Sequence, residues 1–453
     1  RLEWYQDQKF GLLIEFGIWA TWGVTESWPL SQDHYRMNDH PNDWQFDFDV
    51  YREGYFNLSK VFYPRHFDEN QWADMAKDAG MKYINFYAKH VDGFCMYDTK
   101  LTDYKVTSPD CPYSDHPNPD ITERLSTAFR DKGLGIGIVY CYSDWHSPYY
   151  WKPGVPAPDR HINYDVEKEP ERLQNYIDYY TGQIEELMSN YGKVDMLWLD
   201  GGWDKKYLKV DSMVQIARNY QPELIVISRG GDIHENVKTP ERVIPEKPLS
   251  VPWESNESIA DFWSFVPYDN YRSTQELIYM LVDIVSKGGN FLLSVPPMPD
   301  GRITPPSVER LKQMGDWLEV NGEAIYGTRM YSLTHFRDKN ICYTKKDKYV
   351  YAIFLDEKQT EKDQMALTHY VKAENEFPHE GEKNKENRVK LSYYLKIKHV
   401  NPVPGSEIYM LGVEEPLEWE KDEDGVKITI PYSVIQSPPC KYAYSFKIQN
   451  MVE

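Results

Sequence analysis

Short apolar runs alternate with longer amphipathic segments through the first 330 residues of this 453-residue chain. The runs are nearly continuous in their apolar character, which is typical of strands buried on both faces of a parallel sheet. We therefore predict strands at residues 10–16, 82–88, 135–142, 194–199, 224–228 and 290–295.

Between these runs, apolar residues recur at every third or fourth position. This spacing predicts amphipathic helices at residues 68–79, 171–191 and 275–287. Strands and helices that alternate this often indicate an α/β architecture. The number of units favours a (β/α)8-type barrel over an open sheet.

The pattern changes after residue 330. Residues 349–355, 393–399 and 426–430 alternate like half-buried strands, no strong helical stripe appears, and residues 357–390 are highly polar. We therefore predict a catalytic (β/α)8-like barrel domain at residues 1–330. A smaller antiparallel β-sandwich domain at 331–453 follows, with a long exposed loop.

Composition narrows the classes of protein that fit. The chain has 51 basic and 71 acidic residues, a formal charge of −20, and 41% hydrophobic residues. This apolar supply excludes a disordered chain, and the acidic balance argues against a nucleic-acid partner. No stretch approaches the roughly 18 consecutive apolar residues of a membrane span, so we predict none.

The five cysteines are widely spaced and include no C-x-x-C pair, which excludes zinc-ribbon and thioredoxin-like sites. Cys141 lies in a predicted strand and is expected to be a buried thiol. One disulfide is possible, but the sequence does not show which cysteines would form it.

Polar residues that end apolar runs are the first candidates for chemistry, because a parallel barrel carries its site at the C-terminal ends of its strands. Glu15, His90, Asp200 and Arg229 occupy such positions. Trp198 lies two residues before Asp200, so both side chains point to the same side of a strand. An acid, an imidazole, a second acid and a guanidinium around an indole would suit a polar, neutral ligand such as a sugar.

Each candidate also has a purely structural interpretation. Asp200 with its two following glycines could form a turn that caps the next helix, and His90 could be a hydrogen-bonded core residue. Thr239, Pro240 and Glu241 are typical of a helix start. No H-E-x-x-H, Walker, G-x-G-x-x-G turn or G-x-S-x-G motif occurs, so we predict no metal and no cofactor.

At this point the residues resemble a known family, the α-L-fucosidases of glycoside hydrolase family 29. The resemblance covers most of residues 1–330 and depends on the order and spacing of several motifs. These are FGLLI at 10–14, KHVDGF at 89–94, YSDWH at 142–146, LWLDG at 197–201, VSKGGNFLLSV at 285–295 and NGEAIYGT at 321–328.

The resemblance implies a retaining double-displacement hydrolysis of a terminal L-fucose-like sugar from a glycan. Asp200 would be the nucleophile and Glu241 the general acid/base, although the acid/base position varies within the family. The implied substrate-binding residues are Glu15, His90, Tyr142, Trp198, Arg229, Trp263 and Phe265. Of these, Trp263 and Phe265 would form apolar walls for the C5–C6 edge of the sugar.

Two positions depart from the family pattern. Glu15 and Val91 stand where members commonly have histidines that face the sugar hydroxyls. Because both changes alter hydrogen bonding, an α-L-galactosidase is a serious alternative to a plain α-L-fucosidase.

Two further classes remain as alternatives, a non-catalytic carbohydrate-binding homologue and an unrelated metal-dependent barrel hydrolase. The sequence offers no ligand cluster for the second. The family analogy implies a secreted, periplasmic or lysosomal protein. The oligomeric state stays undetermined.

Overall fold

The computed structural model describes residues 1–32, 47–229, 234–356 and 393–451. The chain forms two compact units. The first contains Arg1–Pro245, Ser250–Ser273 and Asn290–Lys312, and the second contains Glu246–Leu249, Thr274–Gly289 and Gln313–Glu453. The domain boundary predicted at residue 330 stays a prediction.

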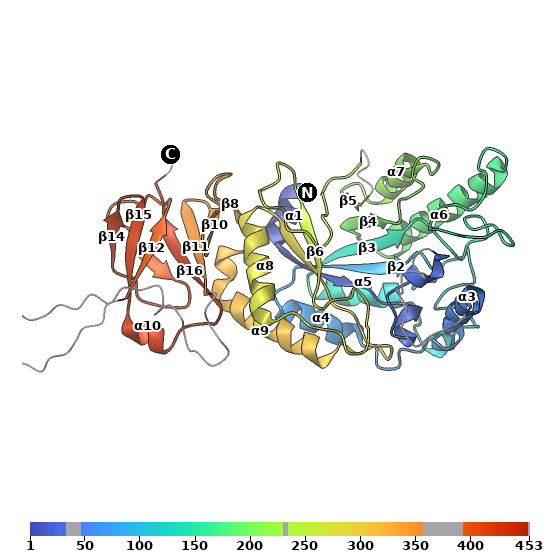
Figure 1. Cartoon of the computed structure of the whole chain (residues 1–453), viewed down its shortest axis with the longest axis horizontal. Coiled ribbons are helices and arrows are strands. Elements are labelled where there is room, and N and C mark those ends of the chain that lie inside the picture. Colours follow the sequence, from blue (N-terminus) through green and yellow to red (C-terminus); the bar gives the residue numbers. More distant parts are fainter. Residues whose placement is uncertain (33–46, 230–233, 357–392, 452–453) are drawn as a thin grey trace, which may run out of the picture. The chain divides into compact units, whose positions relative to one another are not determined.

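The first unit is built on one parallel sheet of seven strands in the order β5-β4-β3-β2-β1-β7-β6 (Figure 1). All six predicted strands are confirmed to within two residues. The strands are β1 (Phe10–Ile14), β2 (Tyr83–Lys89), β3 (Gly135–Cys141), β4 (Met196–Asp200), β5 (Ile225–Ser228), β6 (Glu254–Ser258) and β7 (Asn290–Ser294).

Strand β6 escaped the sequence analysis because its five residues, Glu-Ser-Asn-Glu-Ser, are all polar. Its Glu254 carboxylate is nevertheless fully buried and accepts hydrogen bonds from Trp198 Nε1 at 2.8 Å, from the Tyr83 hydroxyl at 3.3 Å and from the Tyr5 hydroxyl. Burial raises the pKa of Glu254, and these donors oppose that shift. A buried polar strand is tolerated where its acceptors are satisfied in this way.

The segment between β5 and β6 pairs with both edges of the sheet. Parallel bridges join Val237 to Ile227 in β5, and Lys238 to Trp253 beside β6. A third parallel bridge pairs Glu241 with a residue of β6 itself. The expected helix start at residues 239–241 is therefore wrong, because this backbone is extended and hydrogen-bonded to neighbouring strands instead of coiled.

The helices of the first unit are α1 (Leu2–Gln8), α3 (Phe48–Phe56), α4 (Glu69–Asp78), α5 (Ile121–Asp131), α6 (Pro170–Asn190) and α7 (Val210–Tyr220). Helix α4 lies beside α5 and α6 beside α7 (Figure 1). Asp68 caps α4 by accepting from two backbone N–H groups of its first turn, and Asp120 caps α5. The predicted helices at 68–79 and 171–191 are confirmed as α4 and α6.

Helix α8 (Thr274–Ser286) of the second unit confirms the helix predicted at 275–287, and α9 (Pro305–Asn321) is shared by the two units. Short 3-10 helices cover Ile18–Thr21, Trp28–Leu30, Asn57–Lys60, Pro112–Asp115 and Gly322–Ala324.

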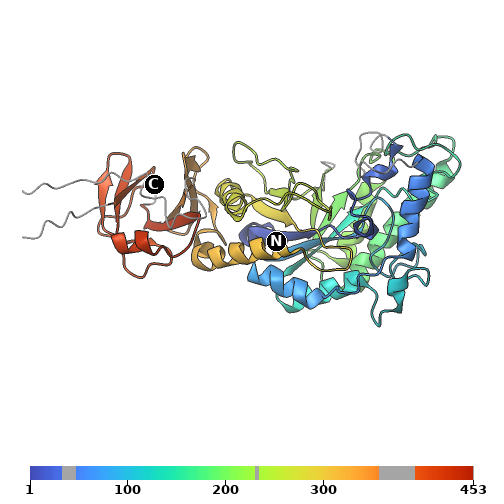
Figure 2. The ribbon, with the colours of Figure 1, turned by 60° about the horizontal axis from the view of Figure 1, so that its bottom comes forward.

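The rest of the second unit consists of antiparallel strands, which Figure 2 shows in orange and red. A six-stranded sheet has the order β13-β16-β11-β10-β8, with β9 paired to β10, and a three-stranded sheet has the order β12-β15-β14. Its elements are β8 (Arg329–Met330), β9 (Arg337–Asp338), β10 (Ile341–Lys346), β11 (Tyr349–Leu355), β12 (Tyr393–Lys398), β13 (Ile408–Met410), β14 (Trp419–Asp422), β15 (Gly425–Ile430), α10 (Tyr432–Gln436) and β16 (Ala443–Gln449).

One hydrophobic core takes side chains from both of these sheets, among them Phe354 and Phe446 from the larger sheet and Ile397 and Ile428 from the smaller one. The antiparallel architecture and the strands predicted at 349–355, 393–399 and 426–430 are confirmed. The short helix α10 was not foreseen. The exposed loop predicted at 357–390 lies outside the described residues.

All five cysteines are free thiols, so the disulfide that the sequence allowed is not formed. Cys141 is buried in β3, as predicted. Within the part of the chain that the structure describes, no helix has the length and apolar character needed to cross a membrane.

Candidate active site

The candidate residues gather because the strands are parallel and their C-terminal ends share one edge of the sheet. Asp200 is the last residue of β4, while Glu15, Tyr142 and Arg229 directly follow β1, β3 and β5. The backbone N–H of Tyr142 donates to the carbonyl oxygen of Asp200 at 3.2 Å, which joins two of these strand ends directly.

The Asp200 carboxylate has three polar neighbours. It accepts from the Tyr87 hydroxyl at 3.1 Å and from the backbone N–H of Gly201 at 2.8 Å, and Arg229 Nη1 lies 3.9 Å away. Gly201 has a φ of +72°, a conformation that favours glycine. Lys209 occupies the N-cap position of α7 (Val210–Tyr220) without a side-chain capping hydrogen bond, so Asp200 does not serve as the cap of this helix.

Arg229 links the two candidate catalytic acids through one nitrogen. Its Nη1 lies 2.7 Å from Glu241 Oε2 as well as 3.9 Å from Asp200 Oδ2. Burial would lower the pKa of the Arg229 guanidinium, but the carboxylates of Asp200 and Glu241 outweigh this effect and raise it. The guanidinium carbon also lies 5.0 Å over the ring of Trp198. Arg229 is therefore a fixed cation between two acids.

Glu241 reaches this position through the extended segment that borders β6. It forms a bridge with Asn256, and the backbone N–H of Arg242 donates to the Asn256 carbonyl oxygen at 3.0 Å. The Glu241 side chain is 39% exposed. A carboxyl group in this position can exchange protons with solvent and reach a ligand.

His90 is buried next to these acids. Its Nδ1 makes a 2.6 Å hydrogen bond with the Ser27 hydroxyl, and its ring centroid lies 5.1 Å from that of Tyr87. Burial lowers the pKa of His90 to about 4, more than the Asp200 carboxylate raises it. The imidazole is therefore neutral near pH 7, and its Nε2 is the remaining atom for hydrogen bonding to a ligand.

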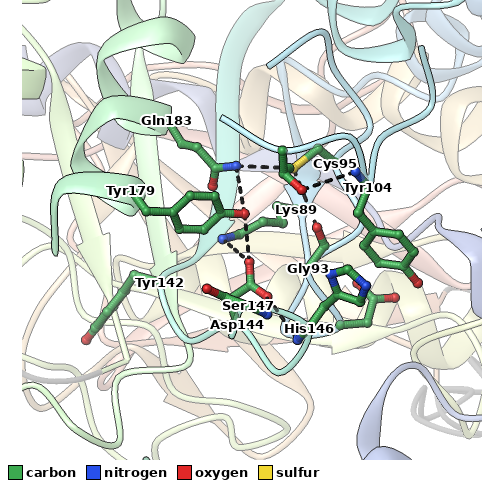
Figure 3. Close-up of polar contacts among 12 residues, drawn as sticks. Lys89, Gly93, Cys95, Tyr104, Tyr142, Asp144, His146, Ser147, Tyr179 and Gln183 are labelled. Atoms are coloured by element: carbon green, nitrogen blue, oxygen red, sulfur yellow. Dashed lines mark hydrogen bonds and ion pairs between the residues drawn. The ribbon is translucent and has the colours of Figure 1, made fainter. Parts of the chain in front are cut away.

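A buried ion pair holds the backbone that carries His90 (Figure 3). Lys89 Nζ lies 3.0 Å from Asp144 Oδ2, with side chains 0% and 1% exposed. Asp144 also accepts from the Tyr179 hydroxyl at 3.1 Å and from the backbone N–H groups of His146 and Ser147 at 3.0 and 2.8 Å. Burial would raise the pKa of Asp144, but the Lys89 ammonium, followed by the charge of His146 and the hydrogen bond from the Ser147 backbone, lowers it.

The same loop is held at two further points. The backbone N–H of Trp145 donates to the carbonyl oxygen of Val91 at 2.7 Å. Gly93 has a φ of +80°, and a Cβ there would lie 2.3 Å from Asp144 Oδ1. The loop after β2 is thus packed tightly against the loop after β3, which limits how far His90 can move.

Glu15 and Glu26 form a second pair of acids at the site. Glu15 is 3% exposed, and its Oε2 has no hydrogen-bond partner among the described residues. Burial, followed by the charge of Glu26, raises the pKa of Glu15 well above its usual value, and Asp200 and Glu241 add to this. Burial raises the pKa of Glu26 to about 7, against hydrogen bonds from Ser264.

Tyr142 and Trp198 are both buried beside the candidate nucleophile. A Cβ on Gly202 would lie 2.1 Å from the Tyr142 hydroxyl, so that the backbone after Asp200 touches this side chain. The Trp198 indole N–H is already bound to Glu254, and its ring supports Arg229.

The two expected apolar walls lie in the loop after β6. The guanidinium carbon of Arg242 stands 4.4 Å over the ring of Trp263, which places Trp263 beside the segment that carries Glu241. Phe265 lies near Gly23, 3.9 Å from where a Cβ would stand.

Sequence reasoning missed Tyr87 and Glu26. All seven residues of β2 are buried, so polarity along the strand does not reveal which side chains point to the site. In the register of β1 and β2, Ile14 pairs with Phe86, so the next residues, Glu15 and Tyr87, lie side by side. The sequence does not contain this register. Glu26 lies in a loop without a recognisable motif. Only the structure reveals its place at the site, through the hydrogen bond between its backbone N–H and Ser264 Oγ.

Two family models match the chain. The one described as alpha-L-fucosidase covers residues 1–323, and the one described as alpha-L-fucosidase C-terminal domain covers residues 335–449.

Curated relatives and solved structures agree with these matches. The chain is 27% identical to the tissue alpha-L-fucosidase of Homo sapiens over 99% of this chain and 89% of the relative. It is 26% identical to the human plasma alpha-L-fucosidase over 99% and 90%. Alpha-L-fucosidase isoenzyme 1 from Paenibacillus thiaminolyticus superposes with a TM-score of 0.75 at 26% identity, covering 100% of this chain and 99% of that structure. The Thermotoga maritima alpha-fucosidase in complex with fucose gives 0.72 at 26% identity, over 98% and 96%. With a family model that spans well over half of its length, the chain belongs to the alpha-L-fucosidase family of glycoside hydrolases.

Proposed function

We propose that this protein is a retaining exo-α-L-glycosidase that releases terminal L-fucose, or a sugar of the L-fucose configuration, from glycans. The observation that carries the proposal is the contact of both Asp200 and Glu241 with one nitrogen of Arg229. Two acids around a fixed cation, beside a neutral imidazole, match the needs of glycoside hydrolysis.

The spacing of the acids supports retention of configuration. Asp200 Oδ2 and Glu241 Oε2 lie 3.9 and 2.7 Å from the same nitrogen, so these two oxygens are at most 6.6 Å apart, the sum of these distances. This limit is compatible with the spacing of a retaining pair and excludes the longer inverting spacings for these two atoms. Retaining glycosidases hold their carboxyl groups about 5–5.5 Å apart, whereas inverting enzymes need roughly 6.5–9.5 Å to admit a water molecule.

In the proposed reaction, an Asp200 carboxylate oxygen attacks the anomeric carbon while Glu241 gives its proton to the leaving oxygen. A glycosyl ester of Asp200 forms and the glycan departs with that proton. Glu241 then removes a proton from water, whose oxygen attacks the anomeric carbon and frees Asp200. Arg229 and Tyr87 hold and orient the Asp200 carboxylate.

The other predicted residues would bind the sugar. His90 offers Nε2 to a ring hydroxyl, Trp263 and Phe265 provide apolar surface, and Tyr142 and Trp198 pack around the reacting centre. A protonated Glu15 both donates and accepts a hydrogen bond, whereas an ionised one only accepts. Because Glu15 and Val91 both stand where the family commonly has histidines, L-galactose is the alternative substrate.

We also propose that residues 236–242 serve as the eighth strand that closes the catalytic barrel of residues 1–330. Residues 331–453 would be its β-sandwich domain. The name of the plasma alpha-L-fucosidase supports a secreted location, and the lysosomal and periplasmic locations rest on the family analogy alone.

The test compares the parent protein with Asp200→Ala on aryl α-L-fucoside and aryl α-L-galactoside. The parent should hydrolyse at least one of them and release the α-anomer first, as followed by proton NMR. Asp200→Ala should lose about a thousandfold or more in kcat. Asp178→Ala, on the exposed side of α6, is the control and should retain activity.

Turnover by Asp200→Ala at the parental rate would overturn the assignment. A parent that binds L-fucose without hydrolysing either substrate would point to the carbohydrate-binding alternative.

A further inference from the structure

A cavity of about 650 Å³ opens beside Trp203, three residues after Asp200. Trp203, Asp204, Lys206 and Tyr207 line it from the loop after β4, and residues 161–162 and 164–167 line it from the loop after β3. This volume is within the roughly 300–1,000 Å³ of small-ligand sites. The hydrolysis described above uses none of these side chains. We call it the Trp203 cavity.

Its two walls are tied together by a buried carboxylate. Asp204 Oδ2 accepts from the Tyr150 hydroxyl at 2.7 Å and from the backbone N–H of Ile162 at 3.0 Å, and Asp204 Oδ1 lies 3.1 Å from His161 Nδ1. Trp151 Nε1 donates to the His161 carbonyl oxygen at 2.9 Å. A cavity with fixed walls needs little ordering when a ligand enters.

A row of aromatic rings leads from the catalytic acids to this cavity. Tyr87, which donates to Asp200, lies beside His90, and the His90 ring centroid is 6.5 Å from that of Trp28. Trp28 in turn meets Trp203 edge-on at 5.7 Å. Trp28 is therefore the side chain that packs between His90 of the candidate active site and Trp203 of the cavity.

We propose that the Trp203 cavity binds the sugar residues of the leaving group, namely the first one or two units of an uncharged oligosaccharide. This rests on the proposed glycosidase function. The Trp203 ring stacks on Trp145 with centroids 5.8 Å apart and has the Arg160 guanidinium carbon 5.4 Å from its centroid. The part of this half-buried ring that lines the cavity offers apolar contact to a pyranose, while Lys206 and the exposed Asp165 and Glu167 offer a donor and acceptors for hydroxyl groups. The acidic excess disfavours an anionic glycan.

The test uses two substrates with the same L-sugar and different leaving groups, α-L-fucosyl fluoride and α-L-fucosyl-lactose, or their L-galactosyl counterparts. Fluoride cannot occupy the cavity, whereas lactose can. We expect Trp203→Ala to lower kcat/KM for the lactose derivative about tenfold or more and to leave the fluoride value within about twofold.

Val166→Phe is a second variant, because it fills the cavity without removing an aromatic partner of Trp28. It should also lower kcat/KM for the lactose derivative and leave kcat/KM for the fluoride unchanged. Tyr63→Ala is the control, since Tyr63 is also an exposed aromatic of the first unit and lies outside the cavity lining. It should change neither value.

An equal loss on both substrates for both variants would overturn the proposal, since it would mean that the residues support the catalytic centre alone. Unchanged rates on both substrates would also overturn it. A parent enzyme that cleaves neither substrate would instead refute the proposed function, so the two failures are distinguishable.

Discussion

Replacing Lys89 by methionine tests how strongly the buried ion pair beside His90 stabilises the fold. Lys89 Nζ and Asp144 Oδ2 are 3.0 Å apart and almost wholly removed from solvent. At this distance, with an effective dielectric constant near 20, their attraction is about 5–6 kcal/mol. Methionine fills a similar volume but leaves the Asp144 carboxylate with the Tyr179 hydroxyl and two backbone donors only. Breaking such a pair typically costs about 3–5 kcal/mol, which is our expectation here.

Urea unfolding followed by tryptophan fluorescence measures this cost, and kcat/KM on an aryl α-L-fucoside shows whether His90 has moved. A double-mutant cycle adds Asp144→Asn and the double variant. The double variant should lose less than the two single variants together, because neither charge then stays buried alone. Lys168→Met is the matched control. Lys168 pairs with Asp165 at 2.9 Å, but the side chains are 81% and 49% exposed, so no measurable change is expected.

Two results would refute this reasoning. One is a loss for Lys89→Met no greater than that for Lys168→Met, and the other is strict additivity in the cycle. Either would mean that the charges are already solvated and that the pair does not hold the loop of His90.

Three further variants probe the site. Gly93→Ala should lower the melting temperature and kcat together, because its Cβ would meet Asp144 Oδ1 at 2.3 Å; unchanged thermal unfolding would contradict this. Trp198→Phe should cost about 1–3 kcal/mol in urea unfolding, since the buried Glu254 loses the donor at 2.8 Å. The free energy of unfolding of Glu26→Gln, relative to that of the parent, should rise by about 3 kcal/mol between pH 5 and pH 8. The folded pKa of Glu26 is about 7 against roughly 4.3 unfolded, so its protonated form stabilises the parent at low pH and this is lost as pH rises through 7. A pH-independent difference in unfolding free energy would contradict it.

The parallel strands were predictable because six of them are short, almost wholly apolar runs. Strand β6 was not, because the burial of Glu254 depends on Tyr83 and Trp198 from strands distant in sequence. No local sequence pattern shows that three hydrogen-bond donors will surround the Glu254 carboxylate. The same limit applies to residues 237–241, whose backbone is stabilised by bridges on both sides.

The candidate site divides in the same manner. Asp200, Arg229 and Glu15 follow from their positions at strand ends, a property visible in the sequence. Glu241 came only from the resemblance to a family, since its local surroundings favoured a helix start. Its place beside Arg229 is produced by pairing with Asn256 in β6, the strand that the apolar pattern could not disclose.

The exchange of a family histidine for Glu15 has a consequence for the sugar that the residue type alone does not reveal. A neutral histidine has one donor and one acceptor, and so does a protonated carboxyl group. Burial and the charge of Glu26 favour the protonated form of Glu15 by raising its pKa, and the nearby Asp200 and Glu241 act in the same direction. Glu15 can therefore preserve the hydrogen-bonding capacity of the residue that it replaces, so its presence is compatible with L-fucose as well as with L-galactose.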